Sequence, residues 1–106
     1  MSKDKLFRDV ERNLRLVART GKVIYGVDYV RWALKNKKVK LIMLSSNIPP
    51  KIERELKNIC ESKKIPIFKS KMNNIQLGDA CLRPHIVTVL AILDLGMLAR
   101  RVEEVA

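Results

Sequence analysis

The chain of 106 residues is poor in several residue types that carry chemistry. It has one histidine, His85, and two cysteines, Cys60 and Cys81, with no Cys-x-x-Cys spacing. A structural zinc site needs four closely arranged cysteine or histidine ligands, and this set cannot supply them. A single histidine also leaves little room for an ordinary Ser-His-Asp triad. We therefore expect no metal site and no catalytic residues, and we interpret both cysteines as buried, reduced thiols.

Other signatures are also missing. Gly21-Lys22 lacks the upstream glycine and the following hydroxyl of a phosphate-binding loop, and residues 21–26 do not form the dinucleotide motif GxGxxG. Aromatic residues make up only 5% of the chain, and no expected strand carries two alternating exposed rings, which argues against a base-stacking sheet. No apolar run is long enough to cross a membrane, and charges begin at Lys3. We predict a cytoplasmic protein that is not an enzyme, has no cofactor and contacts no membrane.

Positive charge is what the chain has in excess. Lys and Arg number 22 against 11 Asp and Glu, which gives a net charge of +11, while 47% of the residues are hydrophobic. That apolar share is enough for a packed core, so the charge does not indicate disorder. A small basic domain repels itself unless an anion neutralises it. Charge alone makes nucleic acid the first candidate for that anion and an anionic membrane surface the second, and we expect nucleic acid rather than a membrane.

Hydrophobic periodicity predicts alternating helices and strands. Apolar residues at positions 6, 10, 14 and 17 form one helical stripe, whereas the apolar run 39–44, interrupted only by Lys40, is typical of a strand buried on both faces. The full pattern predicts helices at 6–20, 27–36, 50–62, 75–81 and from 95 onward, and strands at 22–25, 39–44, 66–68 and 86–93. We predict an α/β fold, a single domain over residues 1–106. It is a three-layer α/β/α sandwich with a four-stranded central sheet.

Polar and glycine residues follow two of the predicted strands. Gly26 and Asn47 each come after a strand and open a helix, and helix N-termini favour anions. If the two strands are parallel neighbours, both residues lie at one edge of the sheet, and Arg83-Pro84-His85 opens the last strand. This arrangement favours binding of an anion such as irregular RNA over catalysis.

Structural explanations stay open for the same residues. Asn47 suits a helix N-cap, Gly26 a tight turn, and His85 an exposed ring at the start of a strand. Asn73 and Asn74 are expected to be turn residues. We expect Trp32 to pack in the core or on a helix face rather than to stack on a base.

Five short blocks carry a resemblance. They are residues 20–26 (TGKVIYG), 40–49 (KLIMLSSNIP), 77–81 (LGDAC), 83–85 (RPH) and 94–96 (DLG). In order and spacing, over about residues 10–98, they resemble the archaeal and eukaryotic large-subunit ribosomal protein thirty family, within the wider family of kink-turn RNA-binding ribosomal proteins. The resemblance implies an α/β/α sandwich whose loops at one end of the sheet dock onto a kink-turn, a sharply bent internal loop of RNA.

The resemblance also implies roles for individual residues. Gly26 would let the backbone approach RNA, and Asn47 would hydrogen-bond a guanine. His85 would stack on an extruded base, with Arg83 and Pro84 beside it. Asp28 stands where the family often has Lys or Asn, so it cannot neutralise a phosphate but can accept hydrogen bonds from a guanine edge. Leu82 stands where a glycine is common. Lys22 and Arg31 complete the predicted RNA-binding set.

The predicted function is therefore a structural constituent of an archaeal large ribosomal subunit. Its expected partners are ribosomal RNA and neighbouring large-subunit proteins, and we expect a monomer when it is free. One alternative is a sibling kink-turn protein of RNA-modification or tRNA-processing particles, which residues 60–66 (CESKKIP) resemble. An alternative from another class is a protein-interaction adaptor or small enzyme on the same fold.

Overall fold

A computed structural model describes residues 3–100 and contains alternating helices and strands. They are α1 (Lys3–Arg12), α2 (Leu14–Thr20), β1 (Lys22–Tyr25), α3 (Val27–Asn36), β2 (Leu41–Leu44), α4 (Pro50–Lys63), β3 (Ile67–Lys69), α5 (Asn74–Ala80) and β4 (Val89–Asp94). The predicted α/β architecture with four strands is confirmed. Within residues 3–100, no helix has the length and apolar character required to cross a membrane.

The four strands form one mixed sheet in the order β1-β4-β2-β3. β1 and β2 are not neighbours in the sheet, because β4 lies between them and runs antiparallel to both. Two strands that are each antiparallel to a third run in the same direction, however. In the register, Tyr25 pairs with Leu90 and Leu44 pairs with Val89. The two strands therefore still end at the same edge of the sheet.

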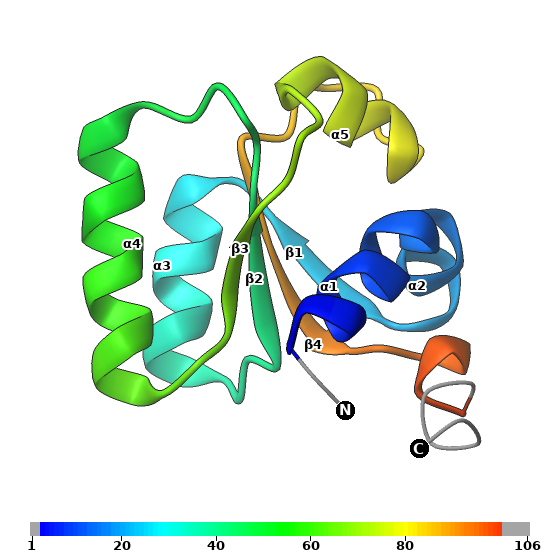
Figure 1. Cartoon of the computed structure of the whole chain (residues 1–106), viewed down its shortest axis with the longest axis horizontal. Helices are drawn as coiled ribbons and strands as arrows, with labels where there is room; N and C mark the ends of the chain where they lie inside the picture. The colour runs from blue at the N-terminus through cyan, green and yellow to red at the C-terminus, as the bar shows by residue number, and fades with distance from the viewer. Residues whose placement is uncertain (1–2, 101–106) are drawn as a thin grey trace.

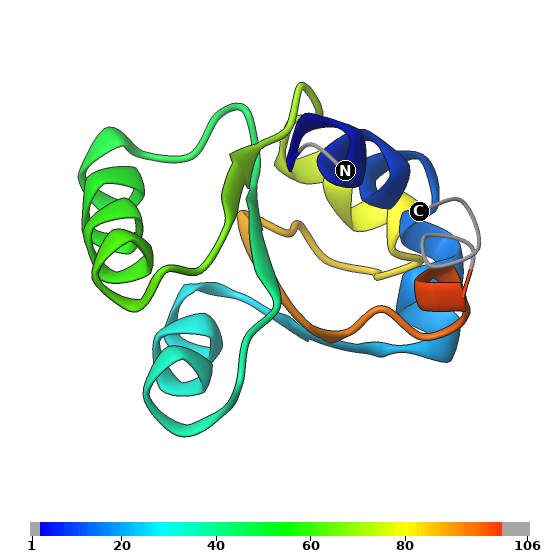
Figure 2. The same ribbon diagram turned by 60° about the horizontal axis from the view of Figure 1, so that its bottom comes forward.

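Helices cover both faces of this sheet (Figures 1 and 2). The α1, α2 and α5 helices pack on one face, where Leu41 and Met43 point into a core. The α3 and α4 helices pack on the other face, against Ile42 and Leu44. Side chains along a strand alternate between faces, so β2 contributes to both cores and all four of its residues are buried. The expectation of a doubly buried strand is confirmed.

The single first helix predicted at 6–20 is two helices, separated at Asn13. The Nδ2 of Asn13 donates to the Asp9 carbonyl at 2.7 Å, while its backbone N–H is shared between the carbonyls of Asp9 and Val10, each at 3.1 Å. Such local side-chain bonds compete with helix continuation. The apolar stripe continues from α1 into α2, so periodicity alone cannot reveal the break.

Two predicted elements near the C-terminus begin later than expected. The last strand starts at Val89 rather than at 86, and Ile86 is 61% exposed in the loop before it. The final helix begins at residue 97 rather than 95, and its predicted inner residue Leu98 is buried. The other two residues of that predicted stripe, Val102 and Val105, lie outside the described residues.

Candidate functional site

Several loops lie at the upper edge of the sheet in Figure 1. We call these loops the rim, which comprises Gly26 and residues 45–49, 70–73 and 81–88. Backbone hydrogen bonds connect its parts: the N–H of Gly26 donates to the Val89 carbonyl at 3.0 Å, and the N–H of Ser45 donates to the Thr88 carbonyl at 2.9 Å. These bonds hold Gly26 and Ser45 against the start of β4, so Gly26 and Asn47 lie at the same edge of the sheet. The 83–85 segment leads to this point, and its Arg83 also lines a hollow together with Lys22.

Asn47 is an exposed residue of the rim whose side chain is held by a second asparagine. Its Oδ1 accepts from the backbone N–H of Asn74 at 3.0 Å, and its Nδ2 donates to the Asn74 Oδ1 at 3.1 Å. Asn47 does not cap α4, the helix that it precedes, because the N-cap of α4 is Pro49 and no side chain caps it. The Asn47 Oδ1 instead accepts from the first N–H of α5. Since an amide has two donors and two acceptor lone pairs, Asn47 keeps one N–H and one lone pair for a ligand.

Asn73 and Asn74, at the start of α5, make different hydrogen bonds. Asn73 caps α5 reciprocally with Gln76: each side chain accepts from the other residue's backbone N–H at 2.9 Å. Asn74 is then placed at the first helical position, where it orients Asn47. The sequence predicts turn residues at 73 and 74. The hydrogen bond between Asn47 and Asn74 joins residues that are 27 positions apart, so the local sequence does not reveal it.

Gly26 has a backbone conformation that few other residues adopt. Its φ is 97° and its ψ is 151°, a region used almost only by glycine. A Cβ at this position would come no closer than 3.8 Å to the Tyr29 Cδ2, so the constraint is conformational rather than a lack of space. The tight-turn explanation is therefore correct, and the open space beside Gly26 leaves its backbone accessible to a ligand.

The segment that carries His85 is packed against α5. The Gly78 carbonyl accepts from the Arg83 N–H at 2.9 Å, and the Asn74 carbonyl accepts from the Val87 N–H at 3.0 Å. A Cβ on Gly78 would lie only 2.4 Å from the His85 carbonyl oxygen. Gly78 thus permits the close approach that fixes this loop, while the Pro84 and His85 side chains remain exposed.

Arg83 is placed by an aromatic ring of β1. Its guanidinium carbon lies 4.6 Å from the centre of the Tyr25 ring, a cation–π geometry. Burial, together with the neighbouring Cys81, raises the pKa of Tyr25 to about 12, so the phenol stays neutral. Burial also raises the pKa of the Cys81 thiol to about 11. Cys81 and Cys60 are both buried and free, as expected.

Leu82 has a left-handed backbone conformation, with a φ of 57°, and its side chain is 53% exposed. A left-handed residue with a Cβ costs roughly 1–2 kcal/mol, and glycine avoids that cost but is freer in the unfolded chain. We expect Leu82→Gly to raise the free energy of unfolding in urea by up to about 1 kcal/mol relative to Leu82→Ala, which keeps the Cβ. Equal stability of the two variants would contradict this explanation.

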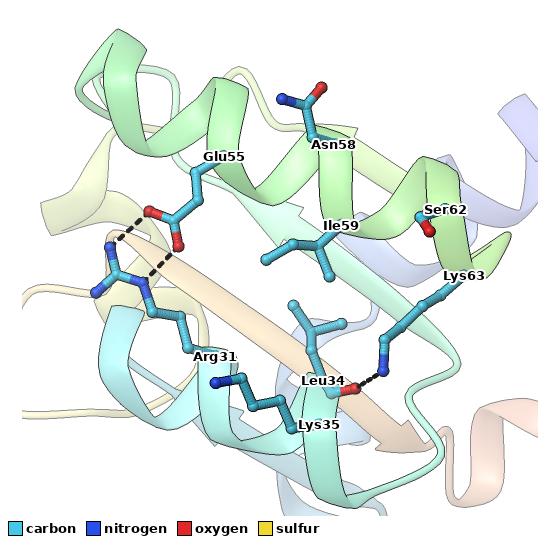
Figure 3. A pocket seen from close by; sticks show the side chains of 8 residues that line it. All are labelled: Arg31, Leu34, Lys35, Glu55, Asn58, Ile59, Ser62 and Lys63. Atoms are coloured by element: carbon cyan, nitrogen blue, oxygen red, sulfur yellow. Dashed lines mark hydrogen bonds and ion pairs between the residues drawn. The ribbon is translucent and has the colours of Figure 1, made fainter.

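The other three predicted residues, Asp28, Arg31 and Lys22, have different surroundings. Arg31 is engaged: its Nε and Nη2 donate to the Glu55 carboxylate at 2.7 Å each, and its Nη1 donates to the Asp28 Oδ1 at 3.0 Å. It therefore joins α3 to α4 (Figure 3). Asp28 is exposed one residue inside α3, close to the rim. Lys22 begins β1, at the opposite end of the strand from Gly26.

A hollow of about 590 Å³ lies between α3 and α4 (Figure 3). Leu34 and Ile59 supply apolar side chains to its wall, and the Lys63 ammonium donates to the Leu34 carbonyl at one end. Its one lining carboxylate is Glu55, which is paired with Arg31. The hollow therefore offers no unpaired carboxylate for acid–base chemistry.

The Arg31–Glu55 pair gives stability a pH dependence. Hydrogen bonds from Arg31 lower the pKa of Glu55 below its usual value, so the contribution is present above the unfolded pKa of about 4.3 and is lost as pH falls through the lower folded pKa. We expect Glu55→Gln to destabilise the protein at neutral pH, with the difference from wild type shrinking below about pH 4. Thermal unfolding from pH 7 to 3 measures this. Glu61→Gln, an exposed change on α4, is the control, and a pH-independent difference for Glu55→Gln would contradict the assignment.

Trp32 does not pack in the core, one of the two positions expected for it; it lies on the face of a helix. It is 49% exposed on α3, one turn after Tyr29, which is 69% exposed. The two rings stand on the solvent side of the helix, and the Tyr29 ring lies beside Gly26.

The family profile described as the Ribosomal protein L7Ae/L30e/S12e/Gadd45 family matches residues 8–100. The chain belongs to this family. It is similar to the large ribosomal subunit protein eL30 of Methanopyrus kandleri and of Methanocaldococcus jannaschii, each 34% identical over 84% of the chain and 82% and 81% of the relative. The eL30 of Trypanosoma brucei brucei is 33% identical over 82% of the chain and 83% of its own length.

A solved structure has the same fold as this L7Ae/L30e-family chain. It is described as a protein with unknown function from Bacillus halodurans C, and it superposes with a TM-score of 0.72 at 28% identity over 86% of this chain and 89% of that one. The resemblance read from the sequence blocks is thus confirmed at the level of family and fold. Within the L7Ae/L30e family, the chain is similar to the eL30 proteins.

Proposed function

We propose that this protein is a structural constituent of the cytoplasmic large ribosomal subunit and binds ribosomal RNA, at a kink-turn, through the rim. Similarity to large-subunit eL30 proteins supports the ribosomal part. The observation that carries the RNA contact is Asn47, an exposed amide that is held in one orientation by Asn74 and presents one donor and one acceptor. The proposal includes no catalytic step, and the free protein is a monomer.

In this proposal, the residues that attract RNA in general differ from those that select one RNA structure. The net charge of +11 draws the protein to the phosphate backbone without regard to sequence. The rim then selects the RNA: Gly26 lets a backbone approach, and the donor and acceptor of Asn47 match the edge of a guanine. The exposed His85 ring stacks on an extruded base, with Arg83 and Pro84 beside it. Arg31 holds Asp28 and α4 in place rather than contacting a phosphate.

Sedimentation tests the ribosomal assignment. The protein, tagged and expressed at its native level in its source cells, is expected to travel with large subunits in a gradient at high salt, and ribosomal RNA is expected to be recovered with it. Recovery in slower fractions with guide RNAs or tRNA-processing RNAs would overturn the ribosomal assignment in favour of another ribonucleoprotein. Recovery with protein alone would overturn RNA binding.

A further inference from the structure

Two exposed aromatic side chains of α3 line a small hollow. Tyr29 and Trp32 stand three residues apart, which places them on the same side of the helix, and together with Asp28 they line a space of about 340 Å³ whose walls are almost entirely apolar. The chain's other aromatic residues lie outside this space: Phe7 and Phe68 stack on each other at 4.9 Å, and Tyr25 lies beneath Arg83. The Trp32 ring has the Lys37 ammonium over it, 5.7 Å from its centre. We call this space the aromatic cleft.

The aromatic cleft adjoins the rim. Gly26 is the N-cap of α3, and a Cβ there would lie 3.8 Å from the Tyr29 Cδ2, so the Tyr29 ring stands beside the half-buried glycine backbone. A stable protein interface buries about 800 Å² on each partner, far more than two rings provide. A single planar group matches the size and apolar walls of the cleft better.

We propose that the aromatic cleft binds an unpaired nucleobase of the RNA, with a preference for guanine; this inference rests on the proposed RNA-binding function. A base presents a flat π-face that stacks on aromatic side chains. The base would enter the cleft beside Gly26. An RNA bound at the rim can therefore place a neighbouring unpaired base in the aromatic cleft. Tyr29 and Trp32 thus extend the contact from the rim onto α3.

Charge at the edges of the cleft supports this occupant. The Asp28 side chain is 94% exposed, and only its Oδ1 is bonded, to Arg31; its Oδ2 has no partner among residues 3–100. A carboxylate accepts two hydrogen bonds from the adjacent N1–H and N2–H groups of guanine, a pair of donors that adenine does not present. The Lys37 ammonium lies 5.7 Å from the Trp32 ring centre, where it can neutralise a phosphate of the same nucleotide.

Trp32 is the single tryptophan of the chain, so its fluorescence reports on the cleft directly. The probe is a kink-turn RNA that carries one unpaired guanine, titrated against the full-length protein. We expect binding to quench Trp32 fluorescence, and Tyr29→Ala and Trp32→Ala each to lower affinity by about 5- to 150-fold, the range for loss of one stacked base. Met97→Ala, which removes another exposed apolar side chain beyond the far end of β4, is the control and should bind like wild type.

A second titration tests the preference for guanine. Replacing the unpaired guanine by adenine should weaken binding to wild type, and Asp28→Asn should reduce the difference between the two RNAs. Equal binding of both RNAs by wild type would overturn the guanine preference. If Asn47→Ala weakens binding while Trp32 fluorescence stays constant and both aromatic variants bind like wild type, the aromatic cleft is rejected and the rim proposal stands. If no variant matters and kink-turn RNA is not preferred over duplex, the proposed function itself fails.

Discussion

Replacing Gly78 by alanine should destabilise the protein by about 1–3 kcal/mol and also weaken RNA binding. The new Cβ would lie 2.4 Å from the His85 carbonyl oxygen, 3.4 Å from the His85 carbonyl carbon and 3.6 Å from the Val87 nitrogen. These are backbone atoms, which cannot turn aside as the end of a flexible side chain can. The 83–87 segment must therefore move away from α5, and this movement displaces the exposed His85 ring.

Urea denaturation and RNA titration together measure this effect. Asp79→Ala, an exposed change at the next position of the same helix, is the matched control and should leave both quantities near wild type. A Gly78→Ala protein with wild-type stability would show that the contact between α5 and the His85 segment is not tight. If Gly78→Ala is destabilised but binds RNA like wild type under conditions in which it is folded, His85 is not part of the binding site.

Asn47→Ala should weaken kink-turn binding by about 1–3 kcal/mol, the cost of losing a buried hydrogen bond to a base. The reason is the fixed orientation of the amide: its bonds to Asn74 leave one N–H and one lone pair directed away from that partner. Because the substitution also removes both hydrogen bonds to Asn74, the free energy of unfolding should fall by about 0.5–1.5 kcal/mol. Isothermal titration with kink-turn RNA, beside urea denaturation, separates the two effects.

Asn74→Ala is the matched control for Asn47. It removes the side-chain oxygen that accepts from Nδ2, but the backbone N–H that donates to the Asn47 Oδ1 remains. Asn74→Ala should therefore lose less affinity than Asn47→Ala. If Asn74→Ala costs as much as Asn47→Ala, the amide pair acts by shaping the loops rather than by reading RNA.

Most of the architecture could be predicted because local pattern and burial agree. The run 39–44 has too many consecutive apolar residues for a surface strand, and β2 proves to be buried on both faces. The order of strands in the sheet depends on contacts between segments that are distant in sequence, and hydrophobic periodicity carries no information about those contacts. Hence the position of β4 between β1 and β2 could not be predicted. The predicted start of the last strand is wrong because Ile86 is apolar and extends the apolar run, although it lies exposed in a loop.

The candidate site was predictable in its position but not in its internal contacts. Gly26 and Asn47 follow strands, and a shared strand direction brings them to one edge of the sheet. The pairing of Asn47 with Asn74 and the approach of Gly78 to His85 depend on tertiary geometry. Of the two positions expected for Trp32, the core is wrong and the helix face agrees with the structure. With the inner face set by Val30 and Leu34, position 32 points outward, as the structure shows.

The most direct test of the RNA-binding claim is a titration of wild type and Asn47→Ala against a kink-turn RNA and a straight duplex of equal length, repeated over a range of salt concentrations. Affinity for both RNAs should fall linearly on logarithmic axes as salt rises, because lysine and arginine contacts release counterions. Wild type should prefer the kink-turn by at least about tenfold, or about 1.4 kcal/mol, at every salt concentration, and Asn47→Ala should lose most of that preference. Equal binding of the two RNAs, with Asn47→Ala indistinguishable from wild type, would contradict recognition through the rim.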